Sequence, residues 1–373
     1  MTEGILTVNA GSSSIKYALF ARDSDLSAPL LAGQVEGLGV AAGTTTHEQA
    51  LAQTVARVHS ELGTARVVAV GHRVVHGGVV FGQPVLIDDA VEAAIAALAP
   101  LAPLHQPHNL AGVRAARAAF PGVPQVACFD TAFHRTQPAV HQCFALPQLW
   151  HDAGVRRYGF HGLSYESVLA QLAATELDLA RGRVVVAHLG NGASMCAIHE
   201  GRSVATTMSF SPLDGLTMGT RCGRLDAAAV LHLQQHHGLD ANAVGELLHK
   251  QSGLLGLSGL SSDMRTLMAS EAPRARLAIE HFVEAALREL AGLVAALRGL
   301  DGLVFTGGIG ENAAALRERI VHGAAWMGLR LDANANASAA VRINAADSLV
   351  QVRVLRTNEE AVIARHTVCA AAP

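Results

Sequence analysis

The sequence predicts an α/β protein made of two similar halves, and three observations support this prediction. Apolar segments of strand length alternate with segments of helical periodicity, which is typical of α/β proteins. A strand–turn–strand pattern with small polar residues at its bend occurs twice, at 5–20 and at 184–198. The chain has 373 residues, which is more than one ordinary hydrophobic core accommodates.

The repeated turn is the most informative of these observations. An offset of 179 residues aligns Asn9 with His188, Gly11 with Gly190 and Lys16 with Met195. Glycine and serine let the backbone approach an anion closely, and their N–H and O–H groups donate to phosphate oxygens. One such turn alone is more often an ordinary hairpin than a phosphate site. Its recurrence in one chain favours a duplicated domain that binds phosphate.

The first half is expected to contain a three-stranded meander, a helix and two further strands. The strands are expected at 5–10, 15–20, 30–35, 67–70 and 126–129. Thr46 to Gln49 has the spacing of a capping box, and apolar residues follow at helical period up to Gly63. The last strand of this half ends on Asp130, so a carboxylate is expected at a strand end.

The second half repeats this organisation. Strands are expected at 183–187, 195–198 and 303–306, and a long amphipathic helix at 274–298. A glycine-rich turn follows the last strand and leads into a helix from about Asn312. Most of the unusual polar residues stand at strand ends, where open α/β sheets bind ligands.

Composition excludes several classes of partner. Half of the residues are hydrophobic, 16% are charged, and the net charge is −3 with no basic stripe, so neither nucleic acid nor an anionic membrane is an expected partner. The five cysteines show no CxxC spacing, which favours reduced thiols over disulfides or zinc. No signal-peptide pattern is present and no apolar stretch reaches the length of a membrane span. We therefore expect a cytoplasmic protein.

The side chains at the strand ends suit phosphoryl transfer, in which the protein positions two anionic reactants and neutralises their charge. The cationic or hydrogen-bonding members are Lys16, Arg73, His105, His161, His188, Arg221 and Arg265. The carboxylates are Asp130, Asp263 and Glu359. No GxSxG, HExxH or Cys–His pattern competes with this set.

A dinucleotide-binding unit is an alternative on local grounds. Residues 308–313 fit the pattern GxGxxA after an expected strand, and Asp332 follows at roughly the distance of a ribose-binding acid. Only about forty residues remain after Asp332, which is too few to complete that type of sheet. A glycine-rich helix N-terminus that faces a nucleotide is the milder interpretation.

Ten segments together resemble the acetate/propionate kinase family of the sugar kinase–Hsp70–actin superfamily. In chain order they are VNAGSSSIK (8–16), GHRVVHGG (71–78), APLH (102–105), FDTAFH (129–134), RRYGFHG (156–162), HLGNGAS (188–194), PLDGLTMGTRCG (212–223), SSDMR (261–265), FTGGIGEN (305–312) and RTNEE (356–360). Each alone is a modest signal, but their shared order over nearly the whole chain makes chance similarity very improbable.

The resemblance implies a fold, a reaction and an assembly. The fold would be two duplicated ribonuclease H-like, actin-like ATPase domains with mixed sheets flanked by helices and an active site in the interdomain cleft. The domains would be 1–130 with 360–373, and 131–359. The reaction would be reversible transfer of phosphate from ATP to acetate, with Mg²⁺ as the metal and Mn²⁺ as an alternative. The family implies a homodimer, for which the long helix at 274–299 is a candidate interface.

The resemblance also implies residue roles. Catalytic positions would be Asp130, His161 and Arg221. Substrate-binding positions would be Arg73, Val75, Leu104, His105, Phe160 and Pro212. Metal-binding positions would be Asn9 and Glu359. ATP- or phosphate-binding positions would be Ser12, Ser14, Lys16, His188, Leu189, Gly190, Asn191, Gly192, Asp263, Met264, Arg265, Gly308, Ile309, Gly310, Glu311 and Asn312.

Several positions depart from the usual family pattern. The sequence after Arg221 is Cys222-Gly223-Arg224, where many members have Ser-Gly-Asp; Tyr165 replaces a usual histidine, and Ala205 replaces a usual aspartate. The 20–70 region also looks shorter. None of these changes removes a residue assigned to the transfer chemistry, but they bear on substrate range and on supporting contacts.

Three questions stay open from the sequence. A propionate or other short-chain acyl kinase has the same fold, and one methylene in an apolar pocket discriminates by only about 1–3 kcal/mol. A non-enzymatic ATP-driven switch would need the nucleotide loops but not Arg73, His105 or His161. Asp130 either orients a catalytic arginine or Mg²⁺ waters, or forms a structural salt bridge; acetate is already ionised at neutral pH and needs no general base.

Overall fold

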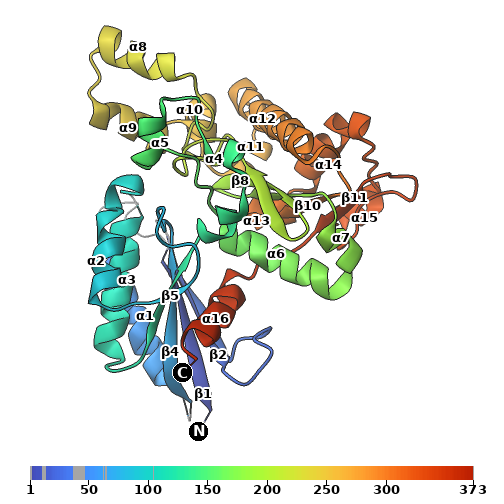
Figure 1. Ribbon diagram of the computed structural model, residues 1–373. Coiled ribbons are helices and arrows are strands. Elements are labelled where there is room, and N and C mark those ends of the chain that lie inside the picture. The colour runs from blue at the N-terminus through green and yellow to red at the C-terminus, as the bar shows by residue number, and fades with distance from the viewer. Residues whose placement is uncertain are drawn as a thin grey trace. The chain divides into compact units, whose positions relative to one another are not determined.

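The computed structural model describes residues 2–10, 14–36, 47–61, 63, 65–103 and 105–372. Two compact units are distinguished (Figure 1). The first comprises Met1–Arg135, Gly162–Ser167 and Asn358–Pro373, and the second comprises Thr136–His161 and Val168–Thr357. The expected capping box at Thr46 and the glycine-serine bend at 11–13 lie outside the described residues.

The first unit is a six-stranded mixed sheet with helices on both faces. Its strands are β1 (Glu3–Ala10), β2 (Ser14–Ala21), β3 (Leu31–Glu36), β4 (Arg66–Val74), β5 (Val85–Leu86) and β6 (Gln125–Phe129), in the order β3-β2-β1-β4-β6-β5. Its helices are α1 (His47–Glu61), α2 (Asp89–Ala97), the 3₁₀ turn η1 (Ala99–Leu101), α3 (Gln106–Ala119) and α16 (Glu359–Ala370). Every strand expected in this half is confirmed.

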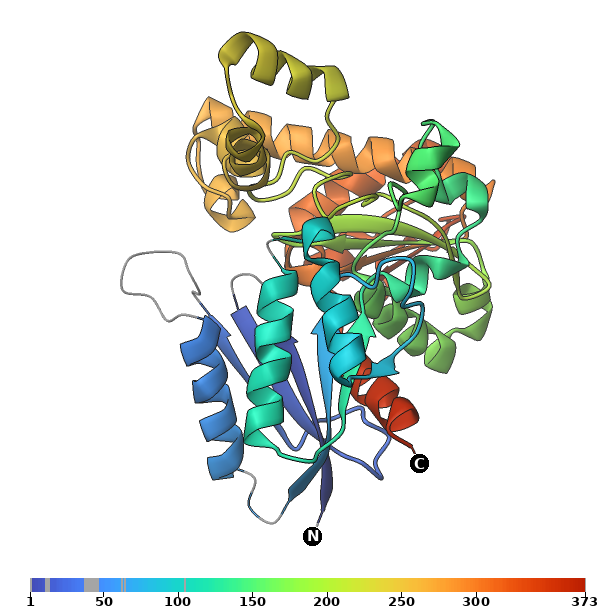
Figure 2. The same cartoon turned by 60° about the vertical axis from the view of Figure 1, so that its left-hand side comes forward.

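Alternation along β1 distributes the core of the first unit between two faces. Leu6 and Val8 pack toward α1 and α3, whereas Ile5 packs toward α16 with Ala361. Figure 2 shows α1 and α3 on one face of the sheet and α16 on the other. The central strands are therefore covered on both sides, as parallel pairing requires.

The second unit contains a five-stranded mixed sheet. Its strands are β7 (Val184–Leu189), β8 (Ala193–His199), β9 (Arg202–Thr206), β10 (Gly302–Thr306) and β11 (Gln351–Val354), in the order β11-β10-β7-β8-β9. Its helices are α4 (Ala139–Gln142), α5 (Gln148–Asp152), α7 (Leu177–Arg181), α8 (Ala227–His237), α9 (Ala241–Lys250), α10 (Gly253–Ser258), α11 (Met264–Met268), α12 (Pro273–Leu297), α13 (Gly307–Asn312), α14 (Ala314–Gly323), η3 (Ala325–Met327) and α15 (Ala333–Ala337). Two further elements cross the unit boundaries, η2 (Ala132–Thr136) and α6 (Gly162–Thr175).

The two sheets share one topology. In each, three antiparallel strands form a meander, and the first strand of the meander pairs in parallel with a later strand, which pairs in parallel with the next. The order β3-β2-β1-β4-β6 in the first sheet corresponds to β9-β8-β7-β10-β11 in the second. The predicted duplication is thus confirmed at the level of strand order and direction.

The residue equivalence across the repeat needs one correction. Asn9 lies opposite Lys16 in the first sheet, whereas His188 lies opposite Ser194 in the second. The second turn is one residue shorter, so the offset of 179 holds for β1 and β7 but not for β2 and β8. The expected equivalence of Lys16 with Met195 is therefore wrong, and Ser194 takes the place of the lysine.

The glycine-rich segment after β10 is itself helical, which was not expected. The helix expected from about Asn312 is observed as α14, which begins at Ala314, but α13 precedes it and begins at Gly307, directly after the strand. Gly307 has a φ of +78°, and a side chain there would approach the Leu189 carbonyl oxygen to 2.8 Å. Glycine thus allows the chain to turn at once from strand into helix.

Helix α12 uses its apolar stripe inside the second unit. Nine of its residues are buried, including Phe282, Leu290 and Leu293, and the helix packs along β8 and β9 and against α10. Leu277 is 54% exposed. Packing inside the second unit therefore accounts for the length of α12. Among the described residues, no helix combines the length and the apolar character needed to cross a membrane.

The first unit contains a buried histidine. His72 on β4 is 1% exposed, and its Nε2 donates to Gln125 Oε1 at 2.7 Å, because the Gln125 amide nitrogen already donates to the Val123 carbonyl. Burial lowers the pKa of His72 from 6.5 to about 4, against the opposing effect of the Gln125 hydrogen bond. The neutral ring is thus the folded-state form at neutral pH.

We expect acid to destabilise the protein through His72. The unfolded chain binds a proton at this position below pH 6.5, but the folded chain does so only near pH 4, so the free energy of unfolding falls across that window. At pH 5 the loss is about 2 kcal/mol from this residue. Urea unfolding at pH 7.5 and 5.0 should show a smaller pH effect in His72→Gln than in the wild type. The exposed His236→Gln variant is the control, and an equal pH effect in all three proteins would contradict this prediction.

Candidate active site

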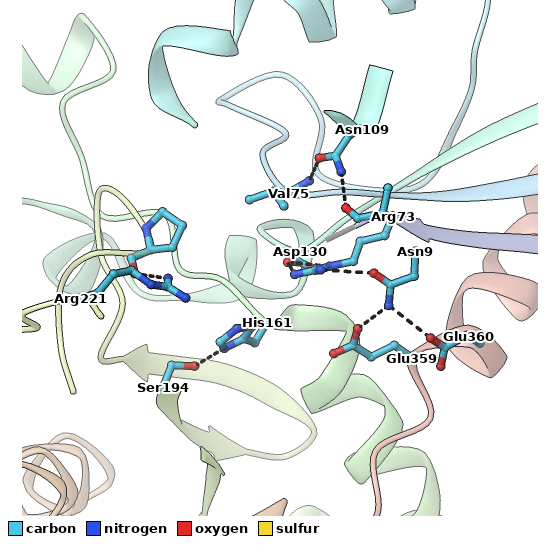
Figure 3. A network of polar contacts seen from close by, with 12 residues as sticks. Asn9, Arg73, Val75, Asn109, Asp130, His161, Ser194, Arg221, Glu359 and Glu360 are labelled. Atoms are coloured by element: carbon cyan, nitrogen blue, oxygen red, sulfur yellow. Dashed lines mark hydrogen bonds and ion pairs between the residues drawn. The ribbon is translucent and has the colours of Figure 1, made fainter. Parts of the chain in front are cut away.

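A buried ion pair joins the ends of two neighbouring parallel strands in the first unit. Arg73 lies at the end of β4, and Asp130 follows β6 directly. Arg73 Nε donates to Asp130 Oδ1 at 3.0 Å and Nη2 donates to Oδ2 at 2.6 Å, which makes a bidentate pair (Figure 3). The exposed fractions of the two side chains are 16% and 2%. Both oxygens of the Asp130 carboxylate thus accept hydrogen bonds from the Arg73 guanidinium.

Burial acts on the protonation of both members of this pair. For Arg73, burial opposes the charged form, but the pKa is raised because Asp130, Glu359 and Glu360 surround the guanidinium with negative charge. For Asp130, burial raises the pKa, and the charge and hydrogen bonds of Arg73 oppose this effect. A charged Arg73 that holds the carboxylate through two donors is the arrangement consistent with the geometry.

Asn9 extends this cluster to two glutamates. Arg73 Nη1 donates to Asn9 Oδ1 at 3.2 Å, and Asn9 Nδ2 donates to Glu359 Oε2 at 3.0 Å and to Glu360 Oε1 at 3.3 Å (Figure 3). Both glutamates open α16, where the helix N-terminus favours negative charge. Glu360 was not expected from the sequence, although its position beside Glu359 was an available signal.

A second amide that the sequence interpretation missed supports the same cluster. Asn109 on α3 is 2% exposed; its Oδ1 accepts from the Val75 backbone N–H at 3.0 Å, and its Nδ2 donates to the Ala10 carbonyl at 2.9 Å. It therefore ties the end of β1 to the segment after β4 (Figure 3). A polar residue on the buried face of an amphipathic helix was the signal available in the sequence.

In the second unit, two imidazole rings and a serine come together. His161 has a left-handed backbone, with φ at 59°, and its Nδ1 lies 2.8 Å from Ser194 Oγ. Its ring stacks on His188 with 4.4 Å between the centroids. Ser194 is fully buried on β8, so it fixes the orientation of the His161 ring. The sequence placed Ser194 in a motif but gave it no role.

Glycine lets Arg221 approach this pair. A side chain at Gly192 would lie 2.7 Å from Arg221 Nη2 and 3.5 Å from His161 Nε2. Arg221 is also fixed by a 2.6 Å hydrogen bond from its Nη1 to the Pro212 carbonyl oxygen (Figure 3). The structure thus brings His161, His188 and Arg221 to one place.

The expected nucleotide segments have defined local structure. A side chain on Gly190 would lie 3.8 Å from the Gly308 backbone nitrogen, so the β7–β8 turn lies beside the start of α13. Asp263 caps α11 by accepting from the Arg265 backbone N–H at 2.7 Å, and the two side chains form an exposed ion pair at 2.7 Å. Gly219 donates its backbone N–H to the Asn191 carbonyl at 3.1 Å.

Other expected site residues fall into three groups. Ser12 and Leu104 lie outside the described residues, as does the side chain of Ser14. Lys16 is exposed on β2, and His105 is half-buried before α3. Phe160 is buried and belongs with Pro212 to the second unit, whereas Val75 belongs to the first.

Two of the residues that depart from the family pattern, Tyr165 and Arg224, have structural partners. Tyr165 is fully buried against the rings of Phe133 and His134. Arg224 pairs with Glu289 on α12 at 3.2 Å; burial raises the pKa of Glu289 and the charge of Arg224 opposes that effect. Tyr165 thus packs among aromatic rings, and Arg224 forms an ion pair.

The structure contradicts the alternative interpretation of residues 308–332 as a dinucleotide-binding unit. Asp332 caps α15 by accepting from the backbone N–H groups of Asn334 and Ala335, each at 3.0 Å. The segment 328–331 before it is not a strand of the sheet, and the strand after β10 is β11 at 351–354. The acid thus caps a helix and does not end a strand.

Two mixed sheets of this topology, each carrying polar residues at its strand ends, define the actin-like ATPase class of fold. The model of the acetokinase family matches residues 4–365. An acetate kinase of Methylocella silvestris is 49% identical over 394 residues, with 98% of each chain covered, and one of Rhodopseudomonas palustris is 48% identical over 389 residues, also with 98% of each covered. The chain belongs to the acetokinase family.

Solved structures agree with this assignment. A propionate kinase from Francisella tularensis matches with a TM-score of 0.90 and 37% identity over 98% of this chain and 99% of that one. The acetate kinase of Porphyromonas gingivalis matches with a TM-score of 0.87 and 36% identity over 99% of this chain and 100% of that one. The predicted family and fold are confirmed.

The Arg73–Asp130 pair is expected to show strong coupling in a double-mutant cycle. Asp130→Asn and Arg73→Met should each lower the free energy of unfolding by about 3 kcal/mol or more, because each leaves one buried charge without its partner. The double variant should lose at least about 1 kcal/mol less than the sum of the two. Urea unfolding measures all four proteins, and additive losses would show that the two side chains do not interact.

Proposed function

We propose that the protein is an acetate kinase, which reversibly transfers the γ-phosphoryl group of ATP to the carboxylate of acetate and forms acetyl phosphate and ADP. The observation that carries this proposal is the family match over nearly the whole chain. A carboxylate oxygen of acetate attacks the γ-phosphorus, the bond to the β,γ-bridging oxygen breaks, and ADP leaves with that electron pair. No proton needs to be removed from the acceptor.

Arg73 is assigned to the acetate carboxylate and Asp130 to the orientation of Arg73. Acetate has a pKa of about 4–5 and is ionised at neutral pH, so a general base has nothing to abstract. The carboxylate of Asp130 already accepts from two nitrogens of Arg73, which supports an orienting role over proton transfer. The bidentate pair fixes the orientation of the Arg73 guanidinium. A donor that is already oriented needs little reorganisation when the acetate carboxylate binds.

His161 and Arg221 are assigned to the phosphoryl group in transfer. Two anionic reactants repel each other, and charge accumulates on the equatorial oxygens as the bond to ADP breaks. The guanidinium held by the Pro212 carbonyl and the imidazole held by Ser194 supply donors with fixed directions. The segments at 188–192, 263–265 and 308–312 are assigned to ATP, and Ser12, Ser14 and Lys16 to its phosphates.

Asn9 and Glu359 are assigned to Mg²⁺, with Mn²⁺ as an alternative metal. Carboxylate and amide oxygens suit a hard cation. In the structure Asn9 Oδ1 accepts from Arg73, while Asn9 Nδ2 holds Glu359 and a second carboxylate, Glu360. No group of three or more acidic, histidine or cysteine side chains in the described part of the chain holds a metal alone. Mg²⁺ usually takes one or two carboxylates from the protein and completes its shell with phosphate oxygens and waters. When bound, the metal would neutralise phosphate charge.

The second candidate function is a kinase that prefers a slightly longer carboxylate than acetate. One solved relative is titled a propionate kinase, so a slightly longer acceptor is a specific alternative. Val75, Leu104, Phe160 and Pro212 are assigned to the acyl pocket, and an apolar pocket discriminates a methylene by only about 1–3 kcal/mol. A non-enzymatic switch is disfavoured, because it gives no reason for Arg73 to be held as a fixed donor.

We also propose a homodimer in the cytoplasm. Four large apolar side chains are exposed within eleven residues of the second unit, namely Val140, Leu146, Leu149 and Trp150, with exposed fractions from 49% to 77%. An apolar cluster of this kind is typical of an interface. Light scattering after gel filtration should give twice the chain mass for the wild type and a lower mass for Trp150→Glu. A monomeric wild type would contradict the dimer.

The proposed reaction predicts acyl phosphate from ATP, Mg²⁺ and acetate. A hydroxamate assay run in parallel with acetate, propionate and butyrate should give the highest kcat/KM with acetate. Arg221→Lys should lose about 100-fold or more, because a fixed planar donor becomes a mobile point charge.

The same assay decides between the candidates. A higher kcat/KM with propionate than with acetate would assign the activity of a propionate kinase instead. No acyl phosphate from any of the three acids would rule out the whole proposal. Near-wild-type turnover by Arg221→Lys would remove the role assigned to that residue while leaving the reaction in place.

A further inference from the structure

The largest fully buried side chain in the described part of the protein is an arginine that no role above has used. Arg317 on α14 is 1% exposed. Its guanidinium makes four hydrogen bonds: to the carbonyl oxygens of Gly310 and Glu311 at 2.9 and 2.8 Å, and to Asn336 Oδ1 and the Asn336 carbonyl, each at 2.8 Å. Within the described residues no carboxylate forms an ion pair with it. Burial lowers the pKa of Arg317, yet a guanidinium stays protonated.

Two of the four acceptors belong to the last turn of α13. This helix has only six residues, so its stability cannot come from its own hydrogen bonds. The last carbonyls of a helix have no partner within the helix and carry a partial negative charge. The Arg317 guanidinium donates to two of these carbonyls, and its positive charge complements the negative end of the helix.

The other two acceptors connect Arg317 to α15. Asn336 accepts through both its side chain and its backbone, and its Nδ2 donates to the Ala314 carbonyl at the start of α14 at 2.9 Å. One side chain therefore joins three consecutive helices. A lysine in its place has a single nitrogen and could not donate in all four directions.

The start of α13 is fixed by a different charged group. Glu311 Oε1 accepts from the Gly307 backbone N–H at 3.0 Å and lies 3.4 Å from the Thr357 backbone nitrogen. Gly307 itself is confined against the backbone of Leu189. Glu311 thus holds the first residue of α13 and Arg317 holds its last turn, beside the β7–β8 turn.

We propose that Arg317 is a positioning residue for nucleotide binding: it holds the 308–312 helix in the conformation that binds ATP, without contacting the nucleotide itself. This inference rests on the proposed function, in which α13 and the turn at 188–192 bind the nucleotide. Loss of the guanidinium frees the last turn of α13. It therefore weakens the binding of ATP and ADP but not the binding of the acyl substrate.

The test measures nucleotide affinity directly in the full-length protein. Calorimetric titration with ADP should give a Kd raised at least tenfold in Arg317→Met and about three- to tenfold in Arg317→Lys, at a temperature where both are folded. KM for ATP should rise with it, whereas KM for acetate should stay within twofold. Arg319→Met is the matched control, because Arg319 lies on the same helix and is exposed, and its Kd should equal that of the wild type.

A merely stabilising residue would give a different result. A lowered unfolding temperature with an unchanged Kd for ADP in Arg317→Met would overturn the proposal, and so would equal increases in KM for ATP and for acetate. If Arg317→Met fails to fold, Arg317→Lys and Asn336→Ala decide by the same titration, and wild-type affinity in both would overturn it. A wild type that binds ADP but forms no acyl phosphate would overturn the proposed function alone.

Discussion

Parallel pairing of β1, β4 and β6 is the constraint on which the chemistry of the first unit depends. Parallel strands end at the same edge of a sheet, so Asn9, Arg73 and Asp130 meet there although they are distant in sequence. The pairing also buries Asp130 almost completely, which makes its bidentate partner obligatory. Asn9 then connects Arg73 to the start of α16, so one guanidinium links the ends of three strands and a helix.

Much of the fold could be predicted because its signals are local. Strand alternation and the glycine-rich turns each depend on a few neighbouring residues, and every expected strand overlaps an observed one; the largest error is at β4, which was expected to end at 70 and ends at Val74. The error in the repeat had a physical cause, since a constant offset cannot represent a turn that is one residue shorter. Lys16 and Ser194 correspond through pairing to Asn9 and His188, and pairing is visible only in the sheet.

The parts of the site that escaped prediction are supporting residues. Asn109, Ser194, Glu360 and Arg317 act on other side chains or on the backbone, and their partners lie up to 351 positions away. An isolated polar residue in an apolar helix suggests a buried partner but does not say which one. Family resemblance assigned roles to residues that are expected to contact substrates, whereas the residues that hold them became apparent only from hydrogen bonds.

The composition of the first unit has a consequence for how the chain folds during synthesis. Asn9 and Glu359 are 350 positions apart, and α16 supplies one whole face of the core around β1. The ribosome completes the sheet of the first unit long before it makes the helix that covers it, and the entire second unit is translated in the interval. Until then, the apolar face formed by Ile5, Ala18 and Phe20 lacks its native cover. The order of the chain therefore leaves this apolar face uncovered during translation until residues 359–370 are made.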